Sequence, residues 1–92
     1  MIIGYLETMQ DYPGLKDAIA RTLRRLRESG GLSKRQMAGR ASLERVYLIQ
    51  LERGEKRPSV NAFFYLSEAL GLKPSEMMKI IEEELQKSSD PS

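Results

Sequence analysis

Hydrophobic positions along the chain recur every three or four residues, which is the period of an amphipathic α-helix. In the segment "LKDAIARTLRRLRES" the apolar residues stand at positions 15, 19, 23 and 26 and form one such stripe. The pair Gly30-Gly31 that follows is typical of a helix C-terminus. No convincing strand pattern occurs anywhere along the chain. The pattern therefore predicts a first helix over residues 15–29.

Four further helices follow at short intervals. Ser33 and Gln36 have the spacing of a capping box, which predicts that a second helix begins after Ser33. A break near residue 42 separates it from a third helix over residues 44–53, closed by Gly54. A fourth helix is predicted over residues 60–70, capped by Ser59. A fifth is predicted over residues 72–85, with Pro74 in its first turn. The chain is thus expected to be all-α, with five short helices.

The domain boundaries follow from these elements. Residues 15–86 are expected to form one folded domain, as suits a chain of 92 residues. Residues 1–14 are expected to be an N-terminal arm or a short extra segment, ending in the turn "DYPG". The polar residues 87–92 are expected to be a disordered tail. No apolar run approaches the length of a membrane span, and no signal peptide is recognised.

Composition removes several classes of chemistry. The chain contains neither cysteine nor histidine, so disulfides, the usual metal sites and histidine-based catalysis are excluded. No pair of acidic residues stands in a recognisably apolar context, so an enzyme is not expected. No cofactor and no metal are expected either.

Charge is distributed unevenly along the chain. Residues 16–57 contain twelve Lys or Arg against five Asp or Glu, a net charge of +7, whereas the whole chain carries +2. From residue 58 onward three lysines stand against six acids, a net charge of −3. A basic body with a mildly acidic tail favours a polyanionic partner, although a solvated surface with accidental asymmetry also fits.

The second and third helices have the spacing of a helix-turn-helix. The string "LSKRQMAGRASLERVYLIQLERGEKRPSVNAFFYLSEALGLKPSEMM" resembles the Cro/repressor-type, or XRE, helix-turn-helix family, and the resemblance covers residues 15–82. It implies a five-helix, lambda-repressor-like domain that binds operator DNA as a homodimer on a palindromic site. The "R-x-Y-apolar" pattern of residues 45–48 is similar to the controller proteins of restriction–modification systems.

The resemblance also implies which residues meet DNA. Lys34 falls where the family commonly has a glutamine, and Arg45 falls at an early position of the recognition helix, suited to guanine. Arg53, Lys56, Arg57 and Ser59 match positions of the family's backbone contacts, which set register more than sequence choice. The residues expected at double-stranded DNA are Ser33, Lys34, Arg45, Val46, Tyr47, Ile49, Gln50, Arg53, Lys56, Arg57 and Ser59.

Two positions depart from the family pattern. Ser42 stands in the turn where the family usually has glycine, so the required backbone conformation is expected to cost energy. Glu44 stands where a Ser or Thr cap is typical, and its carboxylate would face phosphates unless it folds back or accepts from a cytosine amine.

A helical wheel divides the apolar residues of the third helix between two sides. If Leu48 and Leu51 point into the core, Val46 and Ile49 point outward, beside Gln50. Outward apolar side chains can pack on thymine methyl groups, and glutamine can pair with adenine. Alternatively, they form a small patch for a protein partner.

The fifth helix carries an unusually wide apolar arc. Its apolar residues are Met77, Met78, Ile80, Ile81 and Leu85. The arc either belongs to a helix sunk deeply into its own domain or forms a homodimer interface, which is the preferred interpretation. The expected function is a sequence-specific transcriptional regulator in the cytoplasm. The alternative is an adaptor with the same fold that binds a protein such as a toxin or polymerase subunit.

Overall fold

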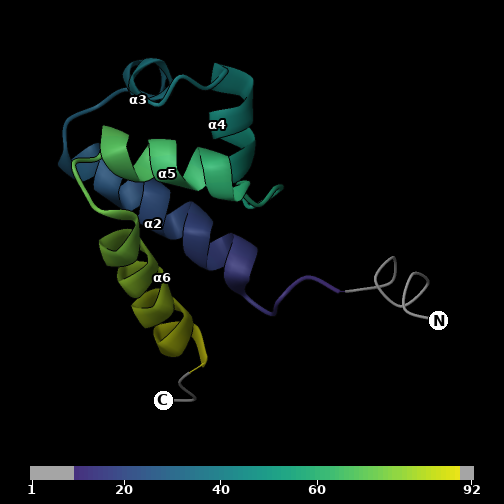
Figure 1. The fold of residues 1–92 in the computed structure, drawn as a ribbon. Helices are drawn as coiled ribbons and strands as arrows, with labels where there is room; N and C mark the ends of the chain where they lie inside the picture. Colours follow the sequence, from purple (N-terminus) through teal and green to yellow (C-terminus); the bar gives the residue numbers. More distant parts are fainter. Residues whose placement is uncertain (1–9, 90–92) are drawn as a thin grey trace.

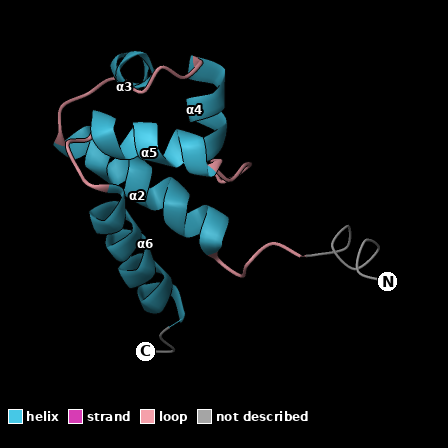
Figure 2. Cartoon of the chain, viewed as in Figure 1, coloured by secondary structure: helices cyan, strands magenta, loops and turns pink. Residues whose placement is uncertain are grey.

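The computed structural model describes residues 10–89, and it shows five helices connected by short loops (Figure 1, Figure 2). No strand occurs in this part of the chain. The prediction of an all-α domain is therefore confirmed. The helices are α2 (Leu15–Ser29), α3 (Lys34–Arg40), α4 (Arg45–Glu52), α5 (Val60–Ala69) and α6 (Pro74–Ser89).

Helix α2 lies at the centre of the domain and packs against both α4 and α6 (Figure 1). Its apolar stripe is buried as the sequence pattern predicts, with Ile19 and Leu23 both less than a tenth exposed. Helix α5 packs against α3 and α6. Because α2 contacts α4 directly, packing against this central helix helps to position α4.

The hydrophobic core draws on all five helices. Its fully buried large side chains are those of Leu23, Met37, Leu48, Leu51, Leu66, Met77 and Ile81. Burying a side chain of this size contributes about 1.5–3 kcal/mol to the free energy of unfolding. The core thus ties every helix to the others despite the small size of the domain.

Side-chain hydrogen bonds cap the starts of α3, α5 and α6, and α6 begins at Pro74, two residues later than predicted. The Ser33 hydroxyl accepts from the Gln36 N–H at 3.0 Å, and the Gln36 side chain accepts from the Ser33 N–H at 2.8 Å, which completes the predicted capping box. The Ser59 hydroxyl accepts from the Ala62 N–H at 3.0 Å and caps α5. At the start of α6, Glu76 accepts from the Lys73 N–H at 2.8 Å.

The structure corrects three sequence-based expectations. Helix α6 continues to Ser89, so residues 87–89 are helical and are not a disordered tail. Met77 and Ile81 are at most 1% exposed within a single chain, so they belong to the core and cannot form a dimer interface. Arg27 is one of four arginines that the helical period spreads around the polar side of the first helix, where solvent exposure is expected, but it is buried. The expectations for residues 1–9 and 90–92 lie outside the described residues.

Candidate nucleic-acid interface

Helices α3 and α4 are joined by the tight turn that a helix-turn-helix requires (Figure 1). Ser42 lies at its centre with φ +56°, and among the described residues it alone has a positive φ without being a glycine. The Leu43 N–H donates to the Ala38 carbonyl at 2.9 Å and closes the turn, while Ala41 is fully buried beneath it. The strained turn therefore has Ser where glycine would be expected, as the sequence indicates.

The inner side of α4 is as the helical wheel predicts. Leu48 and Leu51 are fully buried and anchor the helix to the core. On the outer side Val46 is 62% exposed, and Arg45 at the first helical position is also exposed. Ile49 and Gln50 are half-buried, so Ile49 points outward less than predicted. The exposed apolar surface of α4 is therefore concentrated at its N-terminal end, around Val46.

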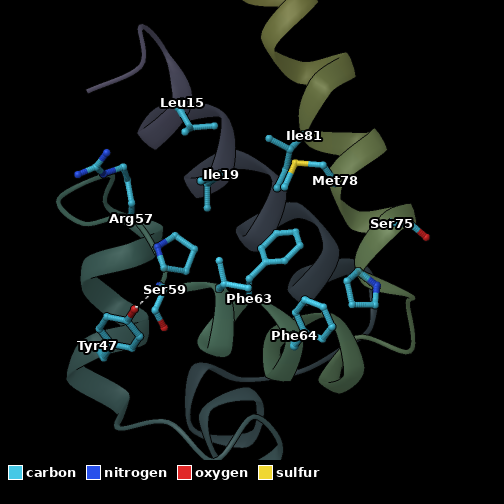
Figure 3. A pocket seen from close by; sticks show the side chains of 13 residues that line it. Leu15, Ile19, Tyr47, Arg57, Ser59, Phe63, Phe64, Ser75, Met78 and Ile81 are labelled. Carbon is cyan, nitrogen blue, oxygen red and sulfur yellow. Dashed lines mark hydrogen bonds between the residues drawn. The ribbon is translucent and has the colours of Figure 1, made fainter. Parts of the chain in front are cut away.

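Tyr47 connects α4 with the start of α5. Its ring is half-buried against the core, and its hydroxyl accepts a hydrogen bond from the Ser59 N–H at 3.3 Å (Figure 3). A phenol oxygen that accepts one bond can still donate its own proton to another group. Ser59 also caps α5 through its hydroxyl. Both residues, predicted at DNA, thus have structural roles within the chain.

The polar residues predicted at DNA lie on accessible surface. Ser33 and Lys34 are exposed at the start of α3, where the Ser33 hydroxyl is engaged in the cap. Arg53 and Lys56 are exposed after α4, and Arg53 Nη1 lies 4.0 Å from Glu55 Oε2. Exposed ion pairs of this length contribute little to stability, so the side chain of Arg53 can be redirected at low cost.

The loop after α4 approaches the start of α2 closely. Gly54 has φ +73°, and a Cβ atom on it would lie 2.9 Å from Asp17 Oδ1. Any other residue there would strain the backbone and would force the Asp17 side chain to move. This close approach positions the following Lys56 and Arg57 beside Lys16, so that the three cations share one shallow pocket.

Asp11 is a member of this site that sequence reasoning missed. Its carboxylate lies 2.8 Å from Lys16 Nζ and 3.1 Å from Arg57 Nη2. The hydrogen bond from Lys16, together with the positive charge of Arg57, lowers the pKa of the Asp11 carboxyl below its ordinary value. In the sequence Asp11 indicates only the start of the turn "DYPG", and no signal shows that it would contact Arg57.

A buried ion pair fixes the C-terminal end of α4 to α2. Arg27 in α2 pairs with Glu52 through two donors, and Arg27 Nη1 also donates to the Leu32 carbonyl at 3.0 Å. The hydrogen bond to Glu52 raises the pKa of Arg27 above its ordinary value although burial opposes it. The pair links the ends of α2 and α4 to the segment that precedes α3.

An apolar groove of about 710 Å³ opens beside the start of α5, between α2 and α6 (Figure 3). Phe63 and Ile81 are among its lining residues, and three others are strongly exposed: Val60 at 76%, Phe64 at 57% and Met78 at 46%. Val60 and Phe64 are apolar positions of the predicted fourth helix, and the sequence pattern does not indicate that they are exposed. Their spacing of four residues on one helix places both on the same face.

In residues 10–89 no helix is both long and apolar enough to cross a membrane. Residues 18–78 match a protein family described as the helix-turn-helix domain. A relative, the uncharacterized HTH-type transcriptional regulator y4dJ of Sinorhizobium fredii, is 30% identical over 64 residues, covering 70% of this chain and 83% of the relative.

Two solved structures are similar to the fold. The clp gene regulator ClgR of Corynebacterium glutamicum aligns with a TM-score of 0.74 and 25% identity, over 86% of this chain and 85% of ClgR. The restriction–modification controller protein C.AhdI of Aeromonas hydrophila aligns with a TM-score of 0.66 and 33% identity, over 72% of this chain and 98% of C.AhdI. The similarity to controller proteins that residues 45–48 suggested is thereby confirmed.

Proposed function

This chain belongs to the helix-turn-helix family of transcriptional regulators, and from that premise we propose that it binds a specific DNA sequence through the outer side of α4. The observation that carries the proposal is the division of α4 between two environments. Leu48 and Leu51 lock the helix to the core, while Arg45 and Val46 stand exposed at its N-terminal end. The N-terminal residues of a recognition helix are those that contact base edges in the major groove.

The exposed side chains divide by the kind of contact that they can make. Arg45 can donate two hydrogen bonds to a guanine, Gln50 can pair with an adenine, and Val46 can pack on a thymine methyl group. Lys34, Arg53 and Lys56 have the flexible cationic side chains suited to phosphates. Sequence choice would then depend on α4, and much of the affinity on the surrounding cations.

We further propose that two copies associate on a palindromic operator. The groove beside α5 exposes Val60, Phe64 and Met78, and clustered apolar side chains of this kind mark interaction surfaces. Of the α6 residues expected at the interface, only Met78, Ile80 and Leu85 retain accessible surface in a single chain. A two-fold dimer would place two α4 helices about 34 Å apart, one turn of DNA. Such a regulator would act in the cytoplasm and without catalysis.

Two measurements test the proposal. Selection of binding sites from random DNA should return a palindrome with half-sites about one helical turn apart. Binding to mixed-sequence DNA should weaken linearly on a log–log plot against salt concentration, since cation–phosphate contacts release counterions. An adaptor that uses Val46, Tyr47 and Ile49 to bind a protein would show neither a selected motif nor this salt dependence.

A further inference from the structure

A small cationic pocket, of about 260 Å³, lies where the start of α2 meets the loop between α4 and α5. Lys16, Lys56 and Arg57 supply its positive charges, and Asp11 and Glu55 complete the lining. Its loop residues follow within a few positions of the end of α4, so the pocket is next to the proposed recognition helix. Three cations in a shallow, open site are suited to an anion with several oxygens.

In the free protein this pocket already contains an anion, the Asp11 carboxylate. Each carboxylate oxygen has its own cation: Oδ2 lies 2.8 Å from Lys16 Nζ and Oδ1 lies 3.1 Å from Arg57 Nη2. Two oxygens divided between two cations is also the way in which a phosphate group would be held. An aspartate is ionised at neutral pH at its ordinary pKa, and the hydrogen bond from Lys16 and the charge of Arg57 lower the pKa of Asp11 further.

We propose that the cationic pocket is a DNA-phosphate site and that Asp11 is its internal competitor. The inference rests on the proposed function, since it needs DNA to approach Arg57. The Asp11 side chain is 43% exposed and precedes α2, outside the packed helices. An ion pair this exposed is weak, so a phosphate can take its place at small cost. Phosphate contacts carry no base preference, so Asp11 lowers the affinity for all sequences alike.

Replacing the carboxylate by its neutral isostere tests the competition. Asp11→Asn should bind both the selected operator and mixed-sequence DNA about two- to fivefold more tightly, the range that one surface ion pair allows. The slope of log affinity against log salt should steepen by up to about 0.9, as for one additional phosphate contact. The matched control is Glu83→Gln, which makes the same change of net charge on the exposed surface of α6 and should change affinity much less.

A double substitution identifies Arg57 as the group for which phosphate and Asp11 compete. In an Arg57→Ala background, Asp11→Asn should lose most of its effect on DNA affinity, because Arg57 is no longer present for Asp11 to occupy. If the wild-type protein binds DNA and Asp11→Asn matches Glu83→Gln, the competition does not exist and the proposed function stands. If the wild-type protein binds no DNA, the proposed function fails and the phosphate site fails with it.

Discussion

Arg27 donates two parallel hydrogen bonds to Glu52, from Nε to Oε2 at 2.7 Å and from Nη2 to Oε1 at 2.9 Å. The partners are 25 residues apart in the sequence, one in α2 and the other at the last position of α4. Both side chains are less than a tenth exposed. Because bidentate pairs fix orientation as well as distance, this contact positions the C-terminal end of α4.

Removing Arg27 should destabilise the fold strongly. Arg27→Met leaves the Glu52 carboxylate buried without a partner, and breaking a buried pair in this way costs about 3–5 kcal/mol. Urea unfolding followed by circular dichroism measures the loss. The double variant Arg27→Met/Glu52→Leu should recover most of the stability, since the unpaired charge is gone. The control is Arg24→Met, because Arg24 lies on the exposed side of α2. If Arg27→Met lowers the free energy of unfolding as little as Arg24→Met does, the ion pair is unimportant for stability.

The turn between α3 and α4 should become more stable when Ser42 is replaced by glycine. At φ +56° a side chain with a Cβ atom is strained, and the left-handed conformation costs about 1–2 kcal/mol for a residue other than glycine. Part of that gain is offset because glycine is more flexible in the unfolded chain. Ser42→Gly should therefore raise the free energy of unfolding by up to about 1 kcal/mol. Ser42→Ala retains the Cβ atom and should leave it nearly unchanged; an equal rise in both variants would exclude relief of strain.

Substitution of Arg45 should affect sequence choice as well as affinity. Arg45→Ala removes a side chain suited to a guanine edge, and loss of such a contact costs about 1–3 kcal/mol and relaxes preference at one position of the site. Competition binding against operators altered at single positions measures both effects. If affinity and base preference are both unchanged, α4 is not the recognition helix.

Substitution of Lys56 should behave differently from that of Arg45. A cation that meets only phosphate contributes to every sequence, so Lys56→Ala should weaken operator and mixed-sequence DNA by the same factor. The salt slope should fall by about 1. Binding titrations at several salt concentrations provide the comparison. A selective loss for the operator would instead indicate a base contact.

The exposed face of α5 should control assembly. Phe64→Lys places a charge in the apolar groove, which should shift sedimentation toward a monomer and weaken operator binding, because two linked half-sites reinforce each other. Tyr12→Lys makes the same chemical change at an aromatic residue that is 63% exposed and is absent from the groove lining. Sedimentation of the Phe64→Lys variant as the same species as wild type would exclude this face as the interface.

Features that depend on neighbouring residues could be predicted well. The Ser33–Gln36 capping box is made within one helical turn, and its residues alone specify it. The same holds for the stripe on α2 and for the division of α4 between Leu48 inside and Val46 outside. In both helices the period of 3.6 residues relates the position of a residue in the sequence to the side of the helix on which it lies, so the pattern itself shows which residues face the core.

Features that depend on packing could not be predicted. Met77 and Met78 are adjacent in one wide apolar arc, yet the first is fully buried and the second is 46% exposed. Which edge of such an arc meets the core depends on how α6 lies against α2 and α5, and the wheel does not contain that information.

The sequence by itself determined the helices, their caps, the strained turn and the family, because these follow from local periodicity and short motifs. Only the tertiary structure decided that Arg27 is buried against Glu52 and that Asp11 lies on Arg57. Those pairs join residues separated by 25 and 46 positions, and opposite charges are too common along the chain to reveal which will meet. Packing of the helices brings the members of each pair together. The Asp11–Arg57 pair thereby sets the charge of the cationic pocket on the proposed DNA-binding surface.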